Sequence, residues 1–511
     1  MWIATVVSNI GTTMNDVGSA WLMTTLTPSA LWVAMIQSAA SLPIFLLSLP
    51  AGALADVIDR RKLLVASQIL ILVAAAALAA FTASGLTTPL VLLALTATMG
   101  VGAALSAPAF QAILPDLVDR GALADAVSLN SLGVNIARAV GPAVGGLIVA
   151  ASGPAAVYAL NAISVIGVVV VLARWRPMKV ERPLPPEHLW SAMVAGYRYA
   201  RHAPALKIVL ARSVAFFLFS SALWALLPIV GRRQLGLDAS GFGALLGCMG
   251  AGAIAGAFLL PRVRRHVTAN TETVLASLLL AAAISALALV GGVWSAGVIL
   301  LFAGMGWISM LSSLNTAAQF AVPKWVKARA LAVYLLVFQG SMTAGSILWG
   351  SLAEASGLRP ALLAASGALA IATISARYFR LPHGQAIDLS PSGHWSSPGV
   401  VDEEISDRGP AMVQIEYRVR PDQIAAFVQA LRAFAAVRRR DGAFRWAVFE
   451  DVAEPGLIVE TFLVASWREH LRQHERATHD DRLTQEDLQR FLVAGATPTV
   501  RHFLTPGRSD Q

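Results

Sequence analysis

The most chemically suggestive residues of the chain follow its second apolar stretch, in the segment Gly52-Ala-Leu-Ala-Asp56-Val-Ile-Asp59-Arg60-Arg61-Lys62. A glycine lets two helices approach closely, and an aspartate can face the positive N-terminus of a neighbouring helix. Arg60 can pair with acids at the same end of a bundle. Basic charge that merely orients a membrane protein would explain the arginines, but it would require neither Gly52 nor Asp56. We therefore predict a charge network built from Gly52, Asp56, Arg60 and Arg61.

A second copy of this motif lies 204 residues further along, where Gly256 corresponds to Gly52, Arg264 to Arg60 and Arg265 to Arg61. The same offset relates a later pair of segments, because Gly141 corresponds to Gly345 and Gly146 to Gly350. A single offset that links distant segments indicates an internal repeat. The second copy has Leu260 in place of Asp56, which predicts that the first half holds the working carboxylate.

Two stripes of polar or small residues recur at helical spacing in apolar segments. The first consists of Asn9, Thr12, Asp16 and Ser19, and the second of Ser131, Asn135, Arg138, Pro142 and Gly145. A charge within a membrane span is costly and should face a cavity or a partner. We expect Asp16 and Arg138 to line one pathway, as a pair, and Asn9, Asn135 and Arg212 to line it with them. The alternative places Asp16 near the outer interface and lets Arg138 extend to the surface.

The second stripe continues into Gly141-Pro142-Ala-Val-Gly145-Gly146. Glycines four residues apart let helices touch, and a proline frees a backbone carbonyl and allows a bend. We predict that Gly141, Pro142, Gly145 and Gly146 form a site of helix packing and bending. Close packing alone would be the simpler explanation of the motif.

Three histidines near the C-terminus, His470, His474 and His479, are close enough in sequence to suggest a metal site. No cysteine accompanies them, and acids and arginines crowd the segment. A solvated helix face explains them better, so we predict neither a metal nor a cofactor. The whole chain carries one cysteine, Cys248, which lies in an apolar segment and cannot form an intrachain disulfide.

The elements that must position these residues are membrane-spanning helices. Mean hydropathy is +0.64 and only 14% of the residues are charged, which excludes a soluble enzyme of this length. With about 20 apolar residues per span, twelve spans are predicted, six on each side of a charged connector. They lie near 2–24, 30–54, 63–84, 88–108, 127–150, 155–173, 207–230, 240–260, 271–291, 294–315, 331–353 and 360–379.

Loop charges predict the orientation of these spans. With the N-terminus inside, the inner loops carry 16 Lys and Arg residues and the outer loops only Arg232, Arg233 and Arg359. Both termini are therefore expected in the cytoplasm. The same loop placement argues against nucleic-acid binding as the cause of a pI near 10.2 and favours contact with lipid head groups. The abrupt start, without a cleavable signal, suggests that part of a cytoplasmic leader is missing.

The last quarter of the chain is different, because residues 381–511 carry a net charge of −4 against +13 for residues 1–380. Residues 381–409 have the composition of a linker. Alternating patterns then predict strands at 412–417, 446–449, 457–462 and 499–503, with helices from Pro421, at 467–476 and at 486–492. The order βαββαβ is ferredoxin-like. This tail is similar to the small α+β domain of the antibiotic-biosynthesis monooxygenases, for which we expect self-association as a homodimer or a regulatory role.

The motif from Gly52 to Arg61 resembles the inner 2–3 loop of the major facilitator superfamily, and the stretch from Gly141 to Gly146 resembles a signature of exporters in that superfamily. Ser8-Asn9-Ile-Gly11, Ala20-Trp21-Leu22 and Thr27-Pro28-Ser29 resemble the branch of enterobactin-exporter-like transmembrane secretion effectors. The resemblance implies an all-α membrane protein with the twelve-helix major facilitator fold, a small α+β tail, and a gate at the first motif. Its domains are expected at 1–173, 174–205 (cytoplasmic connector), 206–380, 381–409 (linker) and 410–505.

The expected function is secondary active transport in the bacterial inner (cytoplasmic) membrane. We expect efflux of a small hydrophobic or amphipathic molecule such as a drug, siderophore or secondary metabolite, by proton antiport. No histidine lies within a span, so carboxylates, Asp16 first, would carry the proton. No Walker-type phosphate loop is present, which argues against direct use of ATP. Two alternatives stay open: a membrane-anchored oxidoreductase-like enzyme acting through the tail, and an importer of the same superfamily.

Overall fold

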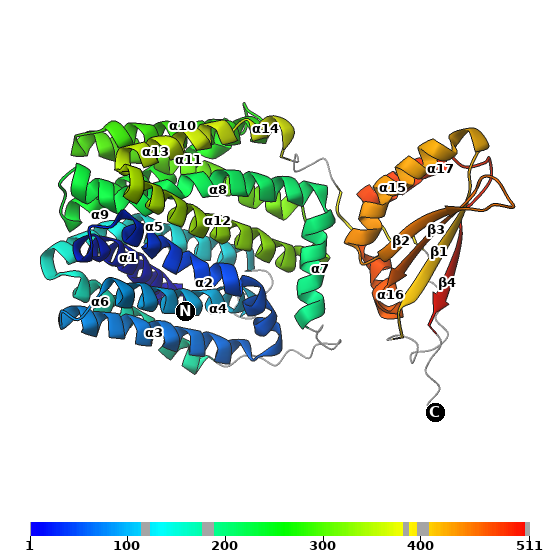
Figure 1. Cartoon of the computed structure of the whole chain (residues 1–511). Coiled ribbons are helices and arrows are strands. Elements are labelled where there is room, and N and C mark those ends of the chain that lie inside the picture. Colours follow the sequence, from blue (N-terminus) through cyan, green and yellow to red (C-terminus); the bar gives the residue numbers. More distant parts are fainter. Residues whose placement is uncertain (1, 114–122, 176–188, 382–387, 396–407, 506–511) are drawn as a thin grey trace. The chain divides into compact units, whose positions relative to one another are not determined.

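The computed structural model describes residues 2–113, 123–175, 189–381, 388–395 and 408–505, and some side chains within these ranges are not described. The chain forms two compact units, one helical and one mixed. The helical unit contains most of the predicted spans, and Figure 1 shows them as a bundle of long helices. The mixed unit comprises Trp190–Lys207, Ala317–Leu331 and Pro382–Gln511.

Six long helices form the first half of the helical unit, each close to a predicted span. They are α1 (Trp2–Leu26), α2 (Ala30–Val57), α3 (Arg60–Ala83), α4 (Pro89–Ile113), α5 (Leu123–Ser152) and α6 (Pro154–Arg174). Ser29 begins α2 and Asp59 begins α3, because their side-chain oxygens accept hydrogen bonds from the first free backbone N–H groups. These two caps therefore mark where one span ends and the next begins.

The second half repeats this plan after the connector. Its helices are α8 (Pro204–Ile229), α9 (Ala239–Val263), α10 (Ala269–Leu289), α11 (Val293–Phe320), α12 (Lys327–Ser356), α13 (Leu358–Ala372) and the short α14 (Ser375–Tyr378). The last predicted span, 360–379, is thus divided between α13 and α14. The connector holds a further helix, α7 (Leu189–His202), which the expected domain division did not include.

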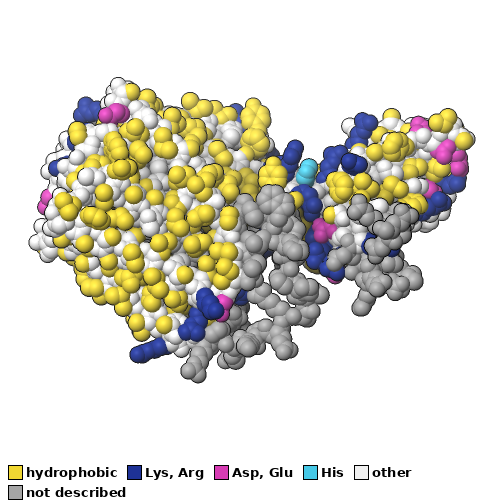
Figure 2. Space-filling model, turned by 60° about the horizontal axis from the view of Figure 1, so that its bottom comes forward, with side chains coloured by type: hydrophobic (Ala, Val, Ile, Leu, Met, Phe, Trp, Pro, Cys, Tyr) yellow, Lys and Arg dark blue, Asp and Glu magenta, His cyan; other side chains and the backbone are white. Residues whose placement is uncertain are grey.

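Eleven helices of the described residues are long and apolar enough to cross a membrane. The twelfth expected span, α1, has 25 residues but is not among them, because its polar stripe lowers its mean hydropathy. Large apolar side chains are exposed around the bundle, among them Leu46, Val73, Leu147, Ile163, Phe258 and Ile371. Figure 2 shows hydrophobic side chains covering most of the visible face of this unit. Such a surface requires lipid as its solvent, so the chain is a multi-pass membrane protein.

The tail is a four-stranded antiparallel sheet with helices. Its elements are β1 (Ala411–Arg418), α15 (Ile424–Arg440), β2 (Phe444–Glu450), β3 (Leu457–Val464), α16 (Trp467–Arg476), α17 (His479–Gln489) and β4 (Thr499–Leu504). The strand order is β2-β3-β1-β4. Strands β1 and β3 alternate buried with half-buried residues, so one face of the sheet packs on the core around Phe427, Leu431 and Phe434 of α15.

Two boundaries of the tail differ from expectation. Helix α17 begins at His479, seven residues before the predicted start, because Thr478 and Asp481 form a reciprocal capping box there. Part of the predicted linker packs on the tail: Ser392 N donates to Ala477 O over 2.9 Å, and Trp395 Nε1 donates to Gln485 Oε1 over 2.9 Å. The remaining linker residues, 382–387 and 396–407, lie outside the described part.

Candidate translocation pathway and its closed end

Asp16 lies at mid-span on the face of α1 that does not pack on its neighbours. Gly11 and Gly18 contact α6, since a Cβ on either would meet Asn161 or Tyr158. Thr13 contacts α5, where its hydroxyl donates to Ala137 O over 3.1 Å. Within the polar stripe Thr12 and Asp16 are exposed, whereas Ser19 is buried.

Arg138 occupies a corresponding place on α5. One flank of this helix contacts α1, where a Cβ on Gly141 would clash with Thr13 and a Cβ on Gly145 would lie 2.9 Å from Met14 Cα. The other flank contacts α9. The guanidinium of Arg138 lies between these flanks and is exposed. Pro142 has no N–H to donate to the carbonyl of Arg138, so the backbone is less restrained at this point.

The expected ion pair between Asp16 and Arg138 is not found among the described residues. Thr13 and Ala137 are in contact, so the two charges lie on neighbouring helices. Asn9 is half-buried on the face of α1 that carries Asp16. The side chain of Asn135 lies outside the described part.

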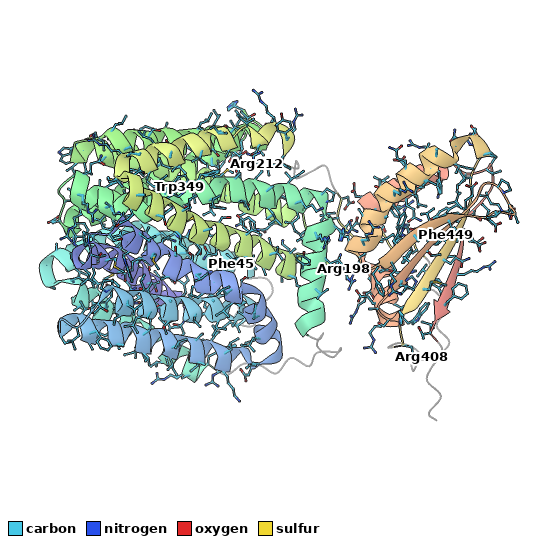
Figure 3. The ribbon with its side chains drawn as sticks, in the orientation of Figure 1. Phe45, Arg198, Arg212, Trp349, Arg408 and Phe449 are labelled. Atoms are coloured by element: carbon cyan, nitrogen blue, oxygen red, sulfur yellow. The ribbon has the colours of Figure 1, made fainter. Side chains whose placement is uncertain are left out.

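Arg212 does not line the pathway, which corrects the expectation. It is buried, and its guanidinium donates to Asn270 Oδ1 over 2.8 Å, to Thr273 Oγ1 over 2.6 Å and to Phe379 O over 3.3 Å. Arg212 therefore joins α8 to α10 and to the end of α14 (Figure 3). A buried guanidinium needs this many acceptors, and here polar groups of the same half supply them.

Glycines seal the two halves together at the end where α1 turns into α2. A Cβ on Gly146 of α5 would lie 2.6 Å from Gly243 Cα of α9, and a Cβ on Gly350 of α12 would lie 2.5 Å from Ala34 Cβ of α2. Gly146 and Gly350 are separated by the repeat offset of 204, so the repeat places one close contact on each side of the bundle. Hydrogen bonds continue the second contact, with Ser41 Oγ 2.7 Å from Thr343 Oγ1.

Charged side chains reinforce this closed end. Glu354 of α12 accepts from the backbone N–H of Ala30, the first residue of α2, over 2.5 Å. Arg232 lies over the ring of Trp21 at 5.7 Å and donates to Thr24 Oγ1 over 3.2 Å, while Arg233 donates to Pro28 O. Sequence reasoning missed Glu354. The sequence signal for Glu354 was its place in the last turn of a predicted helix. A negative charge there is unfavourable beside the negative C-terminal end of its own helix dipole, but it is favourable beside the N-terminus of another helix.

At the opposite end, Arg61 and Arg264 make their contacts within their own half. Arg61 donates to Leu172 O over 2.9 Å and to Ala173 O, at the end of α6. Arg60 is half-buried in the first turn of α3. The described hydrogen bonds between the halves all lie between mid-span and the α1–α2 end. The bundle is therefore held together at that end.

Two expectations about the repeated motif need correction. A Cβ on Gly52 would meet no described atom within 4 Å, so this glycine makes no close helix contact here, whereas a Cβ on Gly256 would lie 3.0 Å from Met305 Cα. The second half also has its own carboxylate, because Arg264 pairs with the buried Glu272 of α10 over 2.9 Å. The side chain of Asp56 lies outside the described part.

The histidines of the tail do not form a solvated helix face. His470 is buried, its Nε2 lies 3.3 Å from His474 Nε2, and its ring centre lies 4.7 Å from that of His502. His502 was not predicted as a member of this cluster, because it comes from β4, and His479 is not part of it. Among the described residues no group of three possible ligands is arranged to bind a metal ion.

With this geometry established, the chain can be placed among known proteins. The family model for transmembrane secretion effectors matches residues 1–510. The chain belongs to this family, which is part of the major facilitator superfamily of transporters. The match extends over the tail as well as the helical unit.

Curated relatives are transporters. The chain is 35% identical over 145 residues to the staphyloferrin A transporter of Staphylococcus aureus, covering 28% of this chain and 36% of that protein. It is 29% identical over 215 residues to the enterobactin exporter EntS of Escherichia coli O1:K1, covering 42% and 50%. The chain therefore matches half or less of the length of these relatives.

Solved structures support the fold. A bacterial homologue of the human lysosomal transporter Spinster, in an inward-facing and unoccupied conformation, aligns with a TM-score of 0.58 at 15% identity, covering 74% of this chain and 96% of that one. A POT family transporter in complex with 5-aminolevulinic acid aligns with a TM-score of 0.61 at 14% identity, again over 74% and 96%. All of these relatives and structures are transporters, not enzymes.

Proposed function

We propose that the chain is a secondary active exporter in the bacterial inner membrane, with both termini in the cytoplasm, that moves a siderophore-like amphipathic metabolite outward in exchange for protons. The observation that carries this proposal is that one end of the bundle is closed while two charged side chains are exposed at mid-span. Asp16 and Arg138 are exposed while Gly146 and Gly350 hold the α1–α2 end together. With cytoplasmic termini, that end faces outward and the pathway is accessible from the cytoplasm.

In this proposal Asp16 carries the proton and Arg138 contacts an anionic or polar group of the cargo. Their separation suits that division of roles, because a carboxylate held by a guanidinium would stay ionised and could not exchange a proton readily. The relatives that transport staphyloferrin A and enterobactin favour a metal-chelating metabolite as cargo. Gly52, Asp56, Arg60 and Arg61 act as the gate at the cytoplasmic end when the transporter rocks to its other state.

We further propose that the tail, a four-stranded antiparallel sheet in the order β2-β3-β1-β4, is a ferredoxin-like domain. We assign it a regulatory role, because the family model spans it together with the transporter.

The test is a transport screen in inverted membrane vesicles with siderophores, macrolide-like compounds and dyes. Wild type should accumulate at least one siderophore when the vesicle interior is acidic. Asp16→Asn should reduce this accumulation by about tenfold or more, yet preserve exchange of labelled for unlabelled cargo, because only the proton-coupled step is lost. The matched control is Asp238→Asn, which removes an exposed carboxylate that caps α9. Gradient-driven accumulation by Asp16→Asn at the wild-type rate would refute its role.

A further inference from the structure

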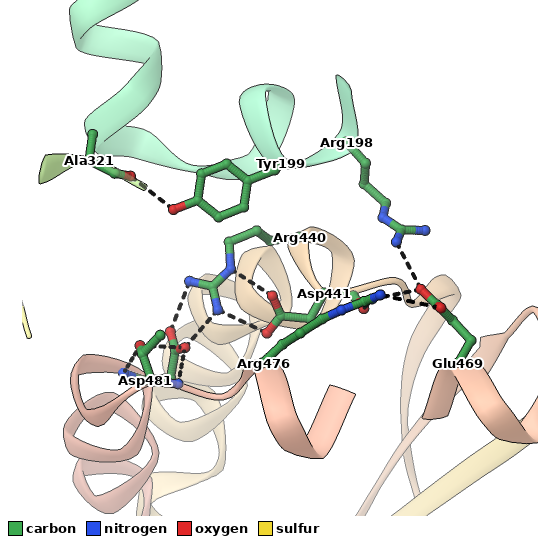
Figure 4. Close-up of polar contacts among 9 residues, drawn as sticks. Arg198, Tyr199, Ala321, Arg440, Asp441, Glu469, Arg476 and Asp481 are labelled. Carbon is green, nitrogen blue, oxygen red and sulfur yellow. Dashed lines mark hydrogen bonds and ion pairs between the residues drawn. The ribbon is translucent and has the colours of Figure 1, made fainter. Parts of the chain in front are cut away.

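The mixed unit contains a surface of the tail that binds two other segments of the same chain. This docking face consists of Arg440, Asp441, Glu469 and Arg476, from the end of α15 and from α16. Figure 4 shows it beside α7, with Arg198 and Tyr199, and beside the turn between α11 and α12, with Ala321. None of these contacts could be expected from the sequence, because α7 and the tail are more than 200 residues apart.

Glu469 is the electrostatic centre of the docking face. Its Oε1 accepts from Arg198 of α7 over 3.2 Å and from Arg476 over 2.6 Å. Burial raises the pKa of Glu469, but the two arginines outweigh this effect and hold its pKa below the usual range. The side chains of Arg198 and Glu469 are 23% and 15% exposed, so water screens their attraction less than at an open surface.

Arg476 extends the contact to the α11–α12 turn. Its guanidinium donates to Asp441 O over 2.9 Å and lies 4.5 Å from the ring centre of Trp325, a cation–π geometry. The guanidinium of Arg440 lies 5.9 Å from the ring centre of Tyr199 and is itself held by Asp441 and Asp481. Two arginines of the tail thus face two aromatic rings.

The surface that receives the tail is itself a joint between α7 and the turn. The Tyr199 hydroxyl donates to Ala321 O over 2.9 Å, and the rings of Tyr199 and Trp325 meet edge to face at 5.9 Å. A Cβ on Gly196 would lie 2.9 Å from Arg329 Cβ, at the start of α12. The tail therefore binds across a joint, and Glu469 with Arg476 connects its two sides.

This joint joins parts of the chain that a rocking transporter must move. Helix α7 leads directly into α8, and α11 and α12 run from the turn into the same half of the bundle. Rocking changes the position of one half relative to the other. Closing the end that carries the Gly52 and Gly256 motifs moves the ends of the second-half helices, so a domain that ties the start of α8 to the α11–α12 turn restricts that motion.

We propose that the tail is an intramolecular clamp that docks through Glu469 and Arg476 on α7 and the α11–α12 turn, and that docking holds the transporter in the conformation seen here. Release of the tail permits the end that carries the Gly52 and Gly256 motifs to close. This inference rests on the proposed rocking transporter, but its partner is the chain itself and its test needs no cargo.

The test measures distances between spin labels in the full chain in nanodiscs, in a Cys248→Ala background that removes the free thiol. One pair, Arg201→Cys on α7 and Val452→Cys on the exposed β2–β3 turn, reports docking. A second pair, Ile58→Cys and His266→Cys, lies in the α2–α3 and α9–α10 turns of the two halves and reports closure of that end. Both Val452 and Ile58 are exposed.

Two variants disrupt the docking face independently: Arg198→Gln removes the ion pair and Trp325→Ala removes the aromatic partner. Each should broaden the docking distance and add a shorter population to the closure distance. The matched control is Arg418→Gln, which breaks the 2.5 Å ion pair with Glu454 inside the tail and should leave both distances unchanged.

Three results would overturn the clamp. The docking distance could stay narrow in both variants, or it could broaden while the closure distance stays the same. The docking distance could also vanish when labelled chains are diluted with unlabelled ones, which would place the tail on a second copy.

Discussion

At the scale of single residues, the charges within the long helices of this chain fall into two kinds that their residue type does not distinguish. Arg138 and Asp16 are exposed at mid-span, whereas Arg212 is buried among acceptors of its own half. All three could be found in the sequence, because charges in apolar segments stand out. Only the structure separates them, since the acceptors of Arg212 come from α10 and α14, far away in the sequence.

The histidine cluster of the tail makes the stability of that domain depend on pH. Burial lowers the pKa of His470 to about 3 and the pKa values of His474 and His502 below their usual range. These histidines are therefore neutral in the folded tail, while in the unfolded chain they take up protons below a pKa of about 6.5. The tail should lose stability as pH falls from about 6.5 towards 3, by up to about 1.4 kcal/mol per pH unit for His470.

We expect His470→Gln to flatten this dependence between pH 7 and pH 5. Thermal unfolding of the tail in the detergent-solubilised chain, followed by proteolysis at each pH, measures it. His479→Gln, which lies outside the cluster, is the control and should behave as wild type. An unchanged pH dependence in His470→Gln would show that other groups cause it.

At the scale of elements, hydropathy and turn residues predict almost every span, because lipid requires long apolar helices and Gly, Pro and Ser mark their ends. Helix α1 was also predicted, because the criterion was a stretch of about 20 mostly apolar residues rather than a threshold of mean hydropathy. The contacts between elements were harder to predict. Gly146 was predicted as a packing residue and Gly350 as its counterpart in the repeat, but neither was predicted to join the two halves. Gly52 shows that a motif shared with a family does not guarantee a close helix contact in one conformation.

The glycine contact between α5 and α9 gives a direct prediction at this scale. Gly146→Leu cannot fit, because even its Cβ would lie 2.6 Å from Gly243 Cα. The closed state should lose population, so Thr12→Cys should react at least tenfold faster with an impermeant maleimide added at the α1–α2 side. Gly167→Leu is the control, because a Cβ there meets no described atom within 4 Å. Equal labelling of the two variants would contradict the seal.

At the scale of the whole molecule, the chain combines a transporter with a small α+β tail, and the two parts differ in net charge: residues 1–380 carry +13 and residues 381–511 carry −4. Composition thus predicted the two regimes and patterning predicted the four strands. The sequence did not predict that α7 and the α11–α12 turn belong to the same compact unit as the tail. Their contacts depend on side chains such as Arg198 and Glu469, which look like ordinary surface charges in the sequence.

The central claim is that the protein moves its cargo outward at the expense of a proton gradient, and its most direct test is the sign of accumulation in inverted vesicles under an imposed pH gradient. An acidic interior should drive labelled siderophore into the vesicles, and a protonophore should abolish the effect. Loss of preloaded cargo from the vesicles under the same gradient would instead identify an importer and contradict the account.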